Sequence, residues 1–122
     1  MNLDKLIEIT KSEVITKSDN INDFNIEYAG ASDLMSDFLA FSKENMFLIT
    51  GLTSPQTITT AAVIGAKGII FVRGKNISEN IKNIANDLDI TILKTNLSMY
   101  VACSILQKNG LKDAMGTDEG LL

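Results

Sequence analysis

Short apolar runs alternate along the chain with stretches in which apolar residues recur at helical spacing. The apolar runs predict strands at residues 13–16, 26–29, 46–50, 68–72 and 90–94. The helical spacing predicts helices at residues 33–42, 55–66 and 78–88, a first helix capped by Asn2, and a last helix that begins at Asn96 or Leu97 and ends at Gly110. Residues 17–25 are polar and predict a loop.

This alternation predicts the fold class, which is an α/β single-domain three-layer sandwich with a mostly parallel sheet and helices on both faces. The strand 68-GIIFV-72 is continuously apolar, as is typical of a parallel strand covered on both faces. Residues 1–112 form the predicted domain. Residues 113–122 show no periodic pattern, so we expect a frayed C-terminal tail there.

The composition narrows the class of protein. Of the 122 residues, 45% are hydrophobic and 21% are charged, which is typical of a globular domain. The net charge of −4 comes without a basic stripe, so nucleic-acid binding is not expected. No apolar run is long enough to span a membrane and residues 1–17 are too polar for a signal peptide, so we expect no membrane association. The single cysteine, Cys103, suits a reducing compartment, and a cytoplasmic protein is expected.

The chain contains no histidine. It therefore lacks the side chain on which Ser–His and Cys–His nucleophile activation depends, and one cysteine is too few for a cysteine zinc cluster. Hydrolytic chemistry would have to depend on Asp, Glu or Lys. We accordingly expect a protein that is not an enzyme, with no catalytic residue, no metal and no cofactor.

The segment 31-ASDLMSDF-38 contains two carboxylates four residues apart. On a helix, Asp33 and Asp37 would share a face and could hold a hard cation together, as an Asp-based enzyme would need. The alternative is that Ser32 caps the helix while Asp33 favours the positive end of the helix dipole. The pattern favours capping, because acidic residues are typical of the first turn of a helix.

Two turns follow predicted parallel strands, at the end of the sheet where open α/β proteins bind ligands. In 50-TGLTSPQT-57, the hydroxyls of Thr50, Thr53 and Ser54 and the backbone N–H groups could hold a phosphate or carboxylate, or Ser54 could simply cap the helix that Pro55 begins.

The second turn is 72-VRGKN-76, which places Arg73 and Lys75 beside Gly74. It does not match the P-loop pattern. Arg73 could pair with an anionic ligand or a partner's carboxylate, or it could be a solvated charge at the rim of the sheet. Cys103 falls on a largely apolar helix, where we expect it to act as a small hydrophobic residue.

Three segments, in this order, resemble the DRTGG domain family: 28-YAGASDLMSDFLAFSKENMFLIT-50, 66-AKGIIFVRG-74 and 88-LDITILKTNLSMYVACSIL-106. The first resembles the family's Gly-Ala-Ser-Asp-Leu helix and the apolar strand that ends in Thr. The others resemble its apolar strand with a glycine turn, and its last strand with the closing helix. The chain departs from the family pattern at residues 51–53, where DRTGG domains carry Gly-Asp-Arg, and at residues 72–74, where they carry Thr-Gly-Gly.

The resemblance implies a fold like that of the N-terminal domain of HPr kinase/phosphorylase and of the uridine-binding domain of Mur ligases. Members of the family occur alone or as insertions between CBS domains. This occurrence implies a regulatory, ligand-sensing module, which we expect to be a homodimer. We expect a nucleotide or small anionic metabolite to be bound by Ser32, Asp33, Thr50, Thr53, Arg73 and Gly74. The alternative is a protein–protein interaction or dimerisation scaffold that engages a protein partner without a small-molecule ligand.

Overall fold

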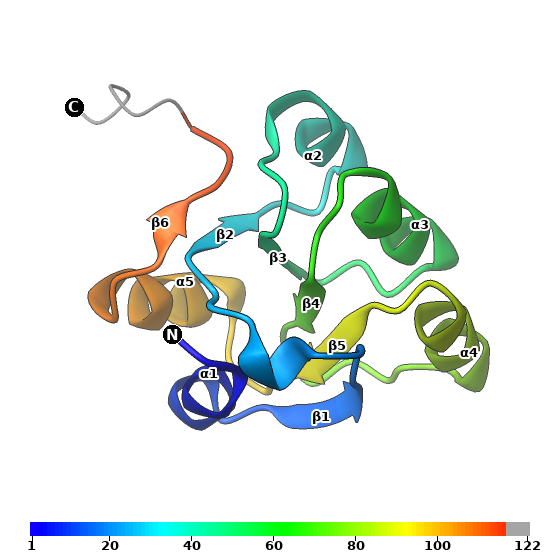
Figure 1. Ribbon diagram of the computed structural model, residues 1–122, viewed down its shortest axis with the longest axis horizontal. Helices are drawn as coiled ribbons and strands as arrows, with labels where there is room; N and C mark the ends of the chain where they lie inside the picture. Colours follow the sequence, from blue (N-terminus) through cyan, green and yellow to red (C-terminus); the bar gives the residue numbers. More distant parts are fainter. Residues whose placement is uncertain (117–122) are drawn as a thin grey trace.

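The computed structural model describes residues 1–116 and contains one six-stranded sheet in the order β1-β5-β4-β3-β2-β6 (Figure 1). The strands are β1 (Glu13–Thr16), β2 (Tyr28–Ala31), β3 (Phe47–Thr50), β4 (Gly68–Phe71), β5 (Thr91–Lys94) and β6 (Lys112–Asp113). Strand β1 pairs antiparallel with β5 at one edge, and every other neighbouring pair is parallel. The predicted mostly parallel sheet is confirmed.

Helices cover both faces of the sheet. On one face lie α2 (Met35–Phe41), α3 (Pro55–Val63) and α4 (Glu79–Asp87), and on the other lie α1 (Leu3–Thr10), α5 (Met99–Lys108) and the 3₁₀ turn η1 (Ile21–Asp23). Strands β2 to β5 are neighbours in chain order, so crossovers of one hand place α2, α3 and α4 on the same face. After β5 the chain returns over the opposite face through α5 and adds β6 beside β2. This is the predicted three-layer α/β sandwich.

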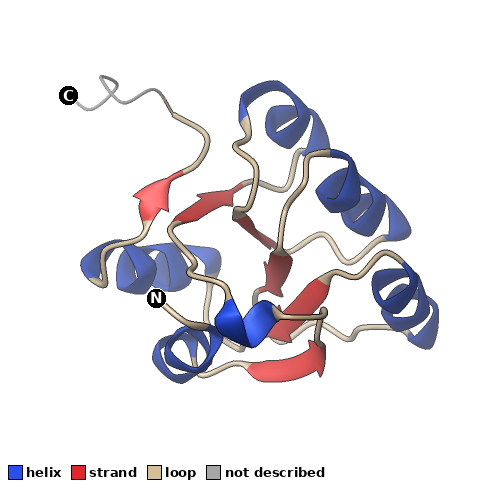
Figure 2. Cartoon of the chain, in the orientation of Figure 1, coloured by secondary structure: helices blue, strands red, loops and turns tan. Residues whose placement is uncertain are grey.

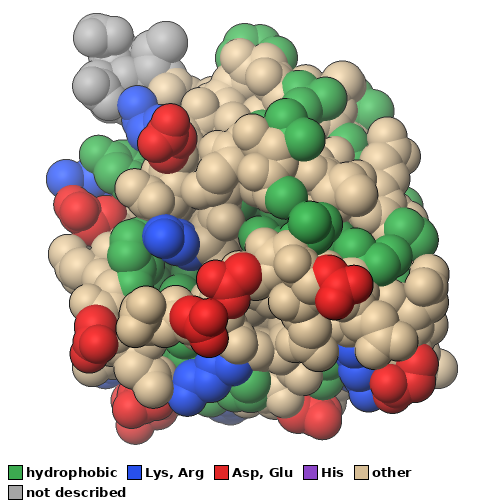
Figure 3. Space-filling view, turned by 45° about the vertical axis from the view of Figure 1, so that its right-hand side comes forward, with side chains coloured by type: hydrophobic (Ala, Val, Ile, Leu, Met, Phe, Trp, Pro, Cys, Tyr) green, Lys and Arg blue, Asp and Glu red, His purple; other side chains and the backbone are tan. Residues whose placement is uncertain are grey.

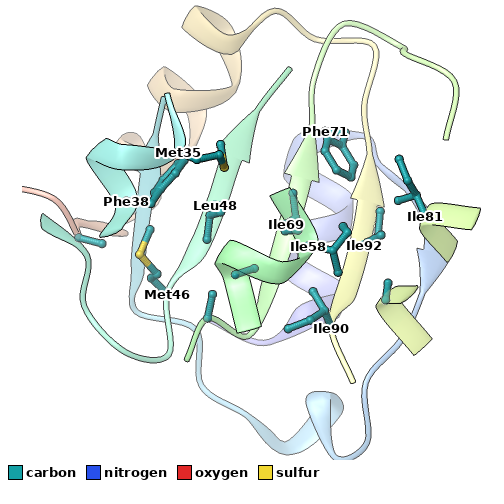
Figure 4. Packing of buried hydrophobic residues seen from close by; sticks show 14 residues of the cluster. Met35, Phe38, Met46, Leu48, Ile58, Ile69, Phe71, Ile81, Ile90 and Ile92 are labelled. Atoms are coloured by element: carbon teal, nitrogen blue, oxygen red, sulfur yellow. The ribbon is translucent and has the colours of Figure 1, made fainter. Parts of the chain in front are cut away.

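The hydrophobic core consists of two clusters, one on each face of the sheet. Every residue of β3 and β4 is buried, and the side chains of β4 alternate between the clusters. Ile69 and Phe71 point toward α2, α3 and α4, whereas Ile70 packs with α1 and α5. Figure 4 shows the first cluster, in which Met35 and Phe38 of α2 meet Leu48 of the sheet. Burial on both faces explains why the central strands are continuously apolar.

Side-chain caps define the starts of three helices. Asn2 accepts a hydrogen bond of 2.9 Å from the N–H of Lys5, as predicted for the first helix. Ser78 and Ser98 accept equivalent bonds of 3.2 Å at the starts of α4 and α5. The last helix was predicted to begin at Asn96 or Leu97. It begins later, at Met99, because Ser98 supplies the cap. Gly110, with φ of 93°, follows the end of α5 as predicted.

Some predicted boundaries differ from the structure. Strand β2 lies two residues later than predicted, and α2 begins at Met35 rather than Asp33. Helix α3 ends at Val63 instead of Ala66, because Gly65 adopts a left-handed φ of 73°. These shifts are confined to element ends, where apolar spacing carries the least information.

Part of the expected C-terminal tail packs against the domain (Figure 2). The N–H of Lys112 donates to the carbonyl of Glu27 at 2.9 Å, and the N–H of Ala114 donates to the carbonyl of Ala29 at 3.0 Å. Ala114 is fully buried. Residues 113–116 thus belong to the packed structure, whereas residues 117–122 of the expected tail lie outside the described residues. A two-residue strand is too short to leave a periodic signal in the sequence.

Gly68 marks the closest approach of the central strands, and replacing it with alanine is expected to destabilise the fold. A Cβ built at Gly68 would enter the ring of Phe47 and lie 2.9 Å from the carbonyl oxygen of Thr91. Overpacking of this kind costs about 1–3 kcal/mol, so Gly68→Ala should lower the free energy of unfolding in urea by that amount.

The matched control is Gly51→Ala, because the nearest atom to a Cβ built there is 3.6 Å away. It should unfold within about 0.5 kcal/mol of the natural protein. Equal losses at both positions would contradict the steric explanation.

Candidate functional site

The loops that leave the carboxyl ends of β2, β3, β4 and β5 emerge at one end of the sheet, because these strands are parallel. Ser32 and Asp33 follow β2, Gly51 follows β3, and Arg73, Gly74 and Lys75 follow β4. We call this end of the molecule the carboxyl edge. It also contains the point where successive helices change face, since α4 follows β4 on one face and α5 follows the neighbouring β5 on the other.

Asp33 holds the first loop onto the second. Its Oδ1 accepts a hydrogen bond of 2.7 Å from the N–H of Gly51 and one of 2.9 Å from the hydroxyl of Thr50. The pKa of Asp33 is lowered mainly by the Gly51 N–H, with further contributions from Thr50, Lys75 and Arg73, while partial burial acts in the opposite direction. The prediction that Asp33 stabilises the first turn of a helix is wrong, because the residue lies before α2 and bonds to β3 instead.

Ser32 and Asp37 form a separate local network. The Ser32 hydroxyl accepts from the N–H of Leu34 at 2.9 Å and donates to Oδ2 of Asp37 at 3.0 Å. Leu34 occupies the N-cap position of α2, so Ser32 does not cap this helix as predicted. Because Asp33 lies outside the helix, the two carboxylates do not share a helix face. Within residues 1–116, no group of three or more potential metal ligands is placed to hold a metal ion.

The turn after β3 is stabilised by threonine hydroxyls. Thr50 is fully buried, and its hydroxyl also accepts from the N–H of Leu52 at 3.2 Å. The Thr57 hydroxyl donates to the carbonyl of Leu52 at 2.6 Å. Ser54 occupies the N-cap position of α3, but its side chain accepts no backbone hydrogen bond. Thr53 is half-buried and has no side-chain hydrogen bond within the described residues.

The turn after β4 is fastened to the turn after β5. The N–H of Arg73 donates to the carbonyl of Leu97 at 2.8 Å, and the N–H of Gly74 donates to the carbonyl of Thr95 at 2.9 Å. Both Arg73 and Gly74 have left-handed backbones, with φ of 65° and 61°. A Cβ built at Gly74 would lie 2.5 Å from Oδ1 of Asn96. The loop therefore has one backbone arrangement, and an arginine is held in a conformation that arginine rarely adopts.

Two cations project from this loop. The Arg73 side chain is exposed, and Lys75 Nζ lies 3.6 Å from the point where a Cβ of Gly51 would be. Across residues 1–116 the ion pairs are Lys5–Glu8 and Lys82–Glu79, so neither Arg73 nor Lys75 is paired with a described carboxylate. The carboxyl edge thus combines a fixed carboxylate with two positive charges that have no such partner.

Of the predicted site residues, the structure brings together Asp33, Thr50, Arg73 and Gly74. Thr53 lies in the turn after β3, and the Ser32 hydroxyl accepts a hydrogen bond within the turn before α2. It adds Lys75 and Asn96, which the predicted set left out. Lys75 carried a signal in the sequence because it stands two residues after Arg73. Asn96 carried none, since its contact with Gly74 depends on how β4 and β5 pair.

A groove with a volume of about 1370 Å³ runs between α5 and the β2–β6 side of the sheet. Its lining includes Ala29, Ala31, Met99, Cys103 and Lys112. Burial raises the pKa of the Cys103 thiol, which is consistent with its expected role as a small hydrophobic residue. Periodicity in the sequence could not indicate this groove, because it arises where α5 leaves part of β2 uncovered.

The mostly parallel sheet, with helices on both faces and charged side chains at its carboxyl edge, defines the general class of the protein as a single α/β domain. A model of the DRTGG domain matches residues 5–109, and the chain belongs to the DRTGG domain family. No curated protein matches the sequence. Within the described residues, no helix is both long and apolar enough to cross a membrane.

The fold is similar to a crystal structure of the CBS and DRTGG domains of the regulatory region of Clostridium perfringens pyrophosphatase, complexed with its activator diadenosine tetraphosphate. The TM-score is 0.74 at 16% sequence identity, and the match covers 99% of this chain and 52% of that chain. The chain therefore spans about half the length of that structure. At this identity the similarity demonstrates a shared fold.

The Asp33 carboxylate should make folding stability depend on pH in acid. Because its pKa is lowered on folding from 3.8, its contribution to stability is fully present above pH 3.8 and is lost as the pH falls toward the folded pKa. Asp33→Asn should cost about 1 kcal/mol at pH 7, and this difference should shrink below about pH 4 in urea unfolding curves. A difference that stays constant down to pH 2.5 would contradict the assignment. Glu44→Gln, which also removes one negative charge, is the control.

The backbone of the Arg73–Lys75 loop can be tested through Gly74. Gly74→Ala should lower the free energy of unfolding by about 2 kcal/mol or more, because it combines a left-handed φ with a contact to Asn96. Gly110→Ala shares only the left-handed φ, since nothing lies within 4 Å of its Cβ position, and should cost about 1 kcal/mol. Chemical denaturation measures both variants, and equal losses would show that the Asn96 contact is unimportant.

Proposed function

We propose that this DRTGG protein is a non-catalytic regulatory module that senses a small anionic metabolite or nucleotide at its carboxyl edge. The observation that carries the proposal is the position of Arg73 and Lys75. They extend from a loop fixed by backbone hydrogen bonds, and they have no ion-pair partner among the described residues. Positive charges on a fixed loop attract a phosphate or carboxylate and hold it in one orientation.

The surroundings of these charges support an anionic ligand. The loop lies where the helices change face, which is the position at which open α/β sheets bind ligands. The N-terminus of α3 has no side-chain cap, so the positive end of the helix dipole favours negative charge there. Thr53 precedes this helix and has a hydroxyl that is free within residues 1–116.

The predicted site residues take different parts in this proposal. Arg73 and Thr53 would contact the ligand directly. Thr50 and Gly74 would position the two turns, because the hydroxyl of Thr50 and the backbone of Gly74 are engaged in internal hydrogen bonds. Ser32 would shape the turn before α2. Asp33 would offer its second carboxylate oxygen, Oδ2, which makes no hydrogen bond to a described residue.

Two lines of support favour sensing over catalysis. The Asp33 and Asp37 carboxylates have separate partners and form no acid–base pair. The similar pyrophosphatase structure is a regulatory region in complex with a nucleotide activator. That structure contains CBS domains as well as DRTGG domains, so its activator supports a nucleotide as a ligand class without assigning it to the DRTGG part. We propose no cofactor.

Thermal unfolding tests the proposal against AMP, ATP, diadenosine tetraphosphate and inorganic pyrophosphate. A compound present at about 100 times its Kd stabilises by about 2.7 kcal/mol, which raises the Tm of a domain of this size by about 8 °C. Arg73→Ala should abolish the shift, because it removes the charge and keeps the loop, whereas Arg73→Lys should retain part of it. A panel without any shift, or a full shift in Arg73→Ala, would contradict the proposed site.

A second candidate function is self-association or protein docking, and an uncharged face favours it. Residues 52–66, which include α3, contain no charged residue, and α2 contains only Asp37. Leu34, Leu39, Phe41 and Val63 on or beside these helices are 56–75% exposed. Figure 3 looks toward this side, where hydrophobic and uncharged side chains gather above a more charged lower region. Two copies that each carry a net charge of −4 could form the proposed homodimer here without opposing like charges. A panel of nucleotides that gives no shift would favour this function.

A further inference from the structure

The groove between α5 and the β2–β6 side of the sheet has a floor of small residues. Ala29 and Ala31 stand two apart on β2, so their methyl groups point to the same face of the sheet, which α5 covers only in part. Met99 and Leu106 of α5 contribute apolar surface to the wall. The volume of about 1370 Å³ is above the roughly 300–1,000 Å³ of typical small-molecule sites, so the groove has room for a ligand along part of its length.

The wall formed by α5 carries hydrogen-bonding side chains without charge. Tyr100, Ser104 and Gln107 line the groove and stand four and three residues apart, which places them on one face of the helix. Residues 95–107 include no charged side chain. Helices α1 and α4 differ, because each carries an ion pair on its outward face. A groove wall that is polar but uncharged is suited to a neutral ligand that forms hydrogen bonds.

The polar groups of this wall are free to bind a ligand. Within the described residues, no hydrogen bond joins the Tyr100 hydroxyl, the Ser104 hydroxyl or the Gln107 amide to another residue. A hydroxyl on a helix commonly donates to the carbonyl four residues earlier, as Thr10 does to Leu6 at 2.7 Å. Ser104 is half-buried and lacks this bond, so its hydroxyl has capacity for an external partner.

The two charged residues in the described lining are already engaged. Lys112 Nζ lies 5.8 Å from the centre of the Tyr28 ring, and Oδ1 of Asp113 accepts a hydrogen bond of 2.8 Å from the N–H of Met115. Their opposite charges also cancel, so the groove offers no net charge to attract an ion. A purely apolar chain fits poorly as well, because it would cover the hydroxyls and the amide of α5 without bonding to them.

We propose that this groove binds the base of a nucleoside, which is a flat, uncharged nitrogen heterocycle. Tyr100 is 85% exposed on the rim, so its ring is available to stack on the base. The Gln107 amide presents a donor and an acceptor side by side, which matches the paired donor and acceptor on the edge of a base. The alanine floor accommodates the flat ring. This site does not use Arg73 and requires no phosphate, so it goes beyond the proposed function.

Calorimetric titration of the full chain tests the inference with adenosine, guanosine, cytidine and uridine, and with ribose as the control that lacks a base. At least one nucleoside should bind at least tenfold more tightly than ribose. Cys103 provides a local readout, because it is the single cysteine of the chain and lines the groove. A saturating nucleoside should shield the thiol and slow its alkylation by iodoacetamide about tenfold, as followed by mass spectrometry.

Two groove variants locate the bound base. Ala31→Leu should weaken the nucleoside at least tenfold, because leucine fills the floor, and it should keep the natural Tm because Ala31 is exposed. Ala40→Leu is the matched control, since it makes the same change at an exposed alanine of α2 outside the groove, and it should bind normally. Gln107→Leu keeps the bulk of the side chain and removes the amide, so it should also weaken binding.

The nucleosides carry no phosphate, so their binding separates this inference from the anion site. Arg73→Ala should bind the nucleoside as the natural protein does. The groove inference is overturned if no nucleoside binds more tightly than ribose, or if a bound nucleoside leaves the alkylation rate of Cys103 unchanged. Binding that neither Ala31→Leu nor Gln107→Leu weakens would also overturn it, because the nucleoside would then lie elsewhere. None of these results decides the proposed function, which depends on the response of phosphate compounds to Arg73→Ala.

Discussion

Burial of the two central strands on both faces is the constraint on which the rest of this structure depends. Strands β3 and β4 expose no residue, so their backbone groups must bond to neighbouring strands and their side chains must fill two cores. The polar groups of these segments are therefore displaced to the strand ends. The carboxyl edge collects a carboxylate and two cations because the buried length of β3 and β4 accommodates no charged side chain.

Asp33 shows how the fold and the proposed site are connected. Its carboxylate occupies the N–H of Gly51, where an external anion would otherwise bind, and so fixes the relative position of the β2 and β3 loops. Oδ2 of Asp33 and Nζ of Lys75 both lie within 4 Å of the point where a Cβ of Gly51 would be. An internal anion beside the two cations would restrict which ligands the proposed site accepts.

The two proposed surfaces are adjacent along the chain. The segment that carries Ser32 and Asp33 continues directly into α2, whose exposed side chains contribute to the uncharged face. Ligand contact at Asp33 would therefore act on the loop that positions α2. In the proposed module, this connection would link a bound metabolite to a protein interface through one turn and one helix.

The sequence by itself determined the fold class, the order of the helices and strands up to α5, and the general location of the candidate site. Apolar runs and helical spacing are local properties, and parallel strands necessarily bring their carboxyl ends to one side, so Arg73 and Thr50 could be assigned to the same edge in advance. The tertiary structure decided what depends on contacts between segments distant in sequence. Asp33 looked like a residue of a helix N-terminus because its real partner, Gly51, lies 18 residues away. The β6 pairing, the position of Lys75 above Gly51 and the Gly74–Asn96 contact have the same origin. Each depends on strand register and loop packing, which leave no periodic trace in the residues themselves.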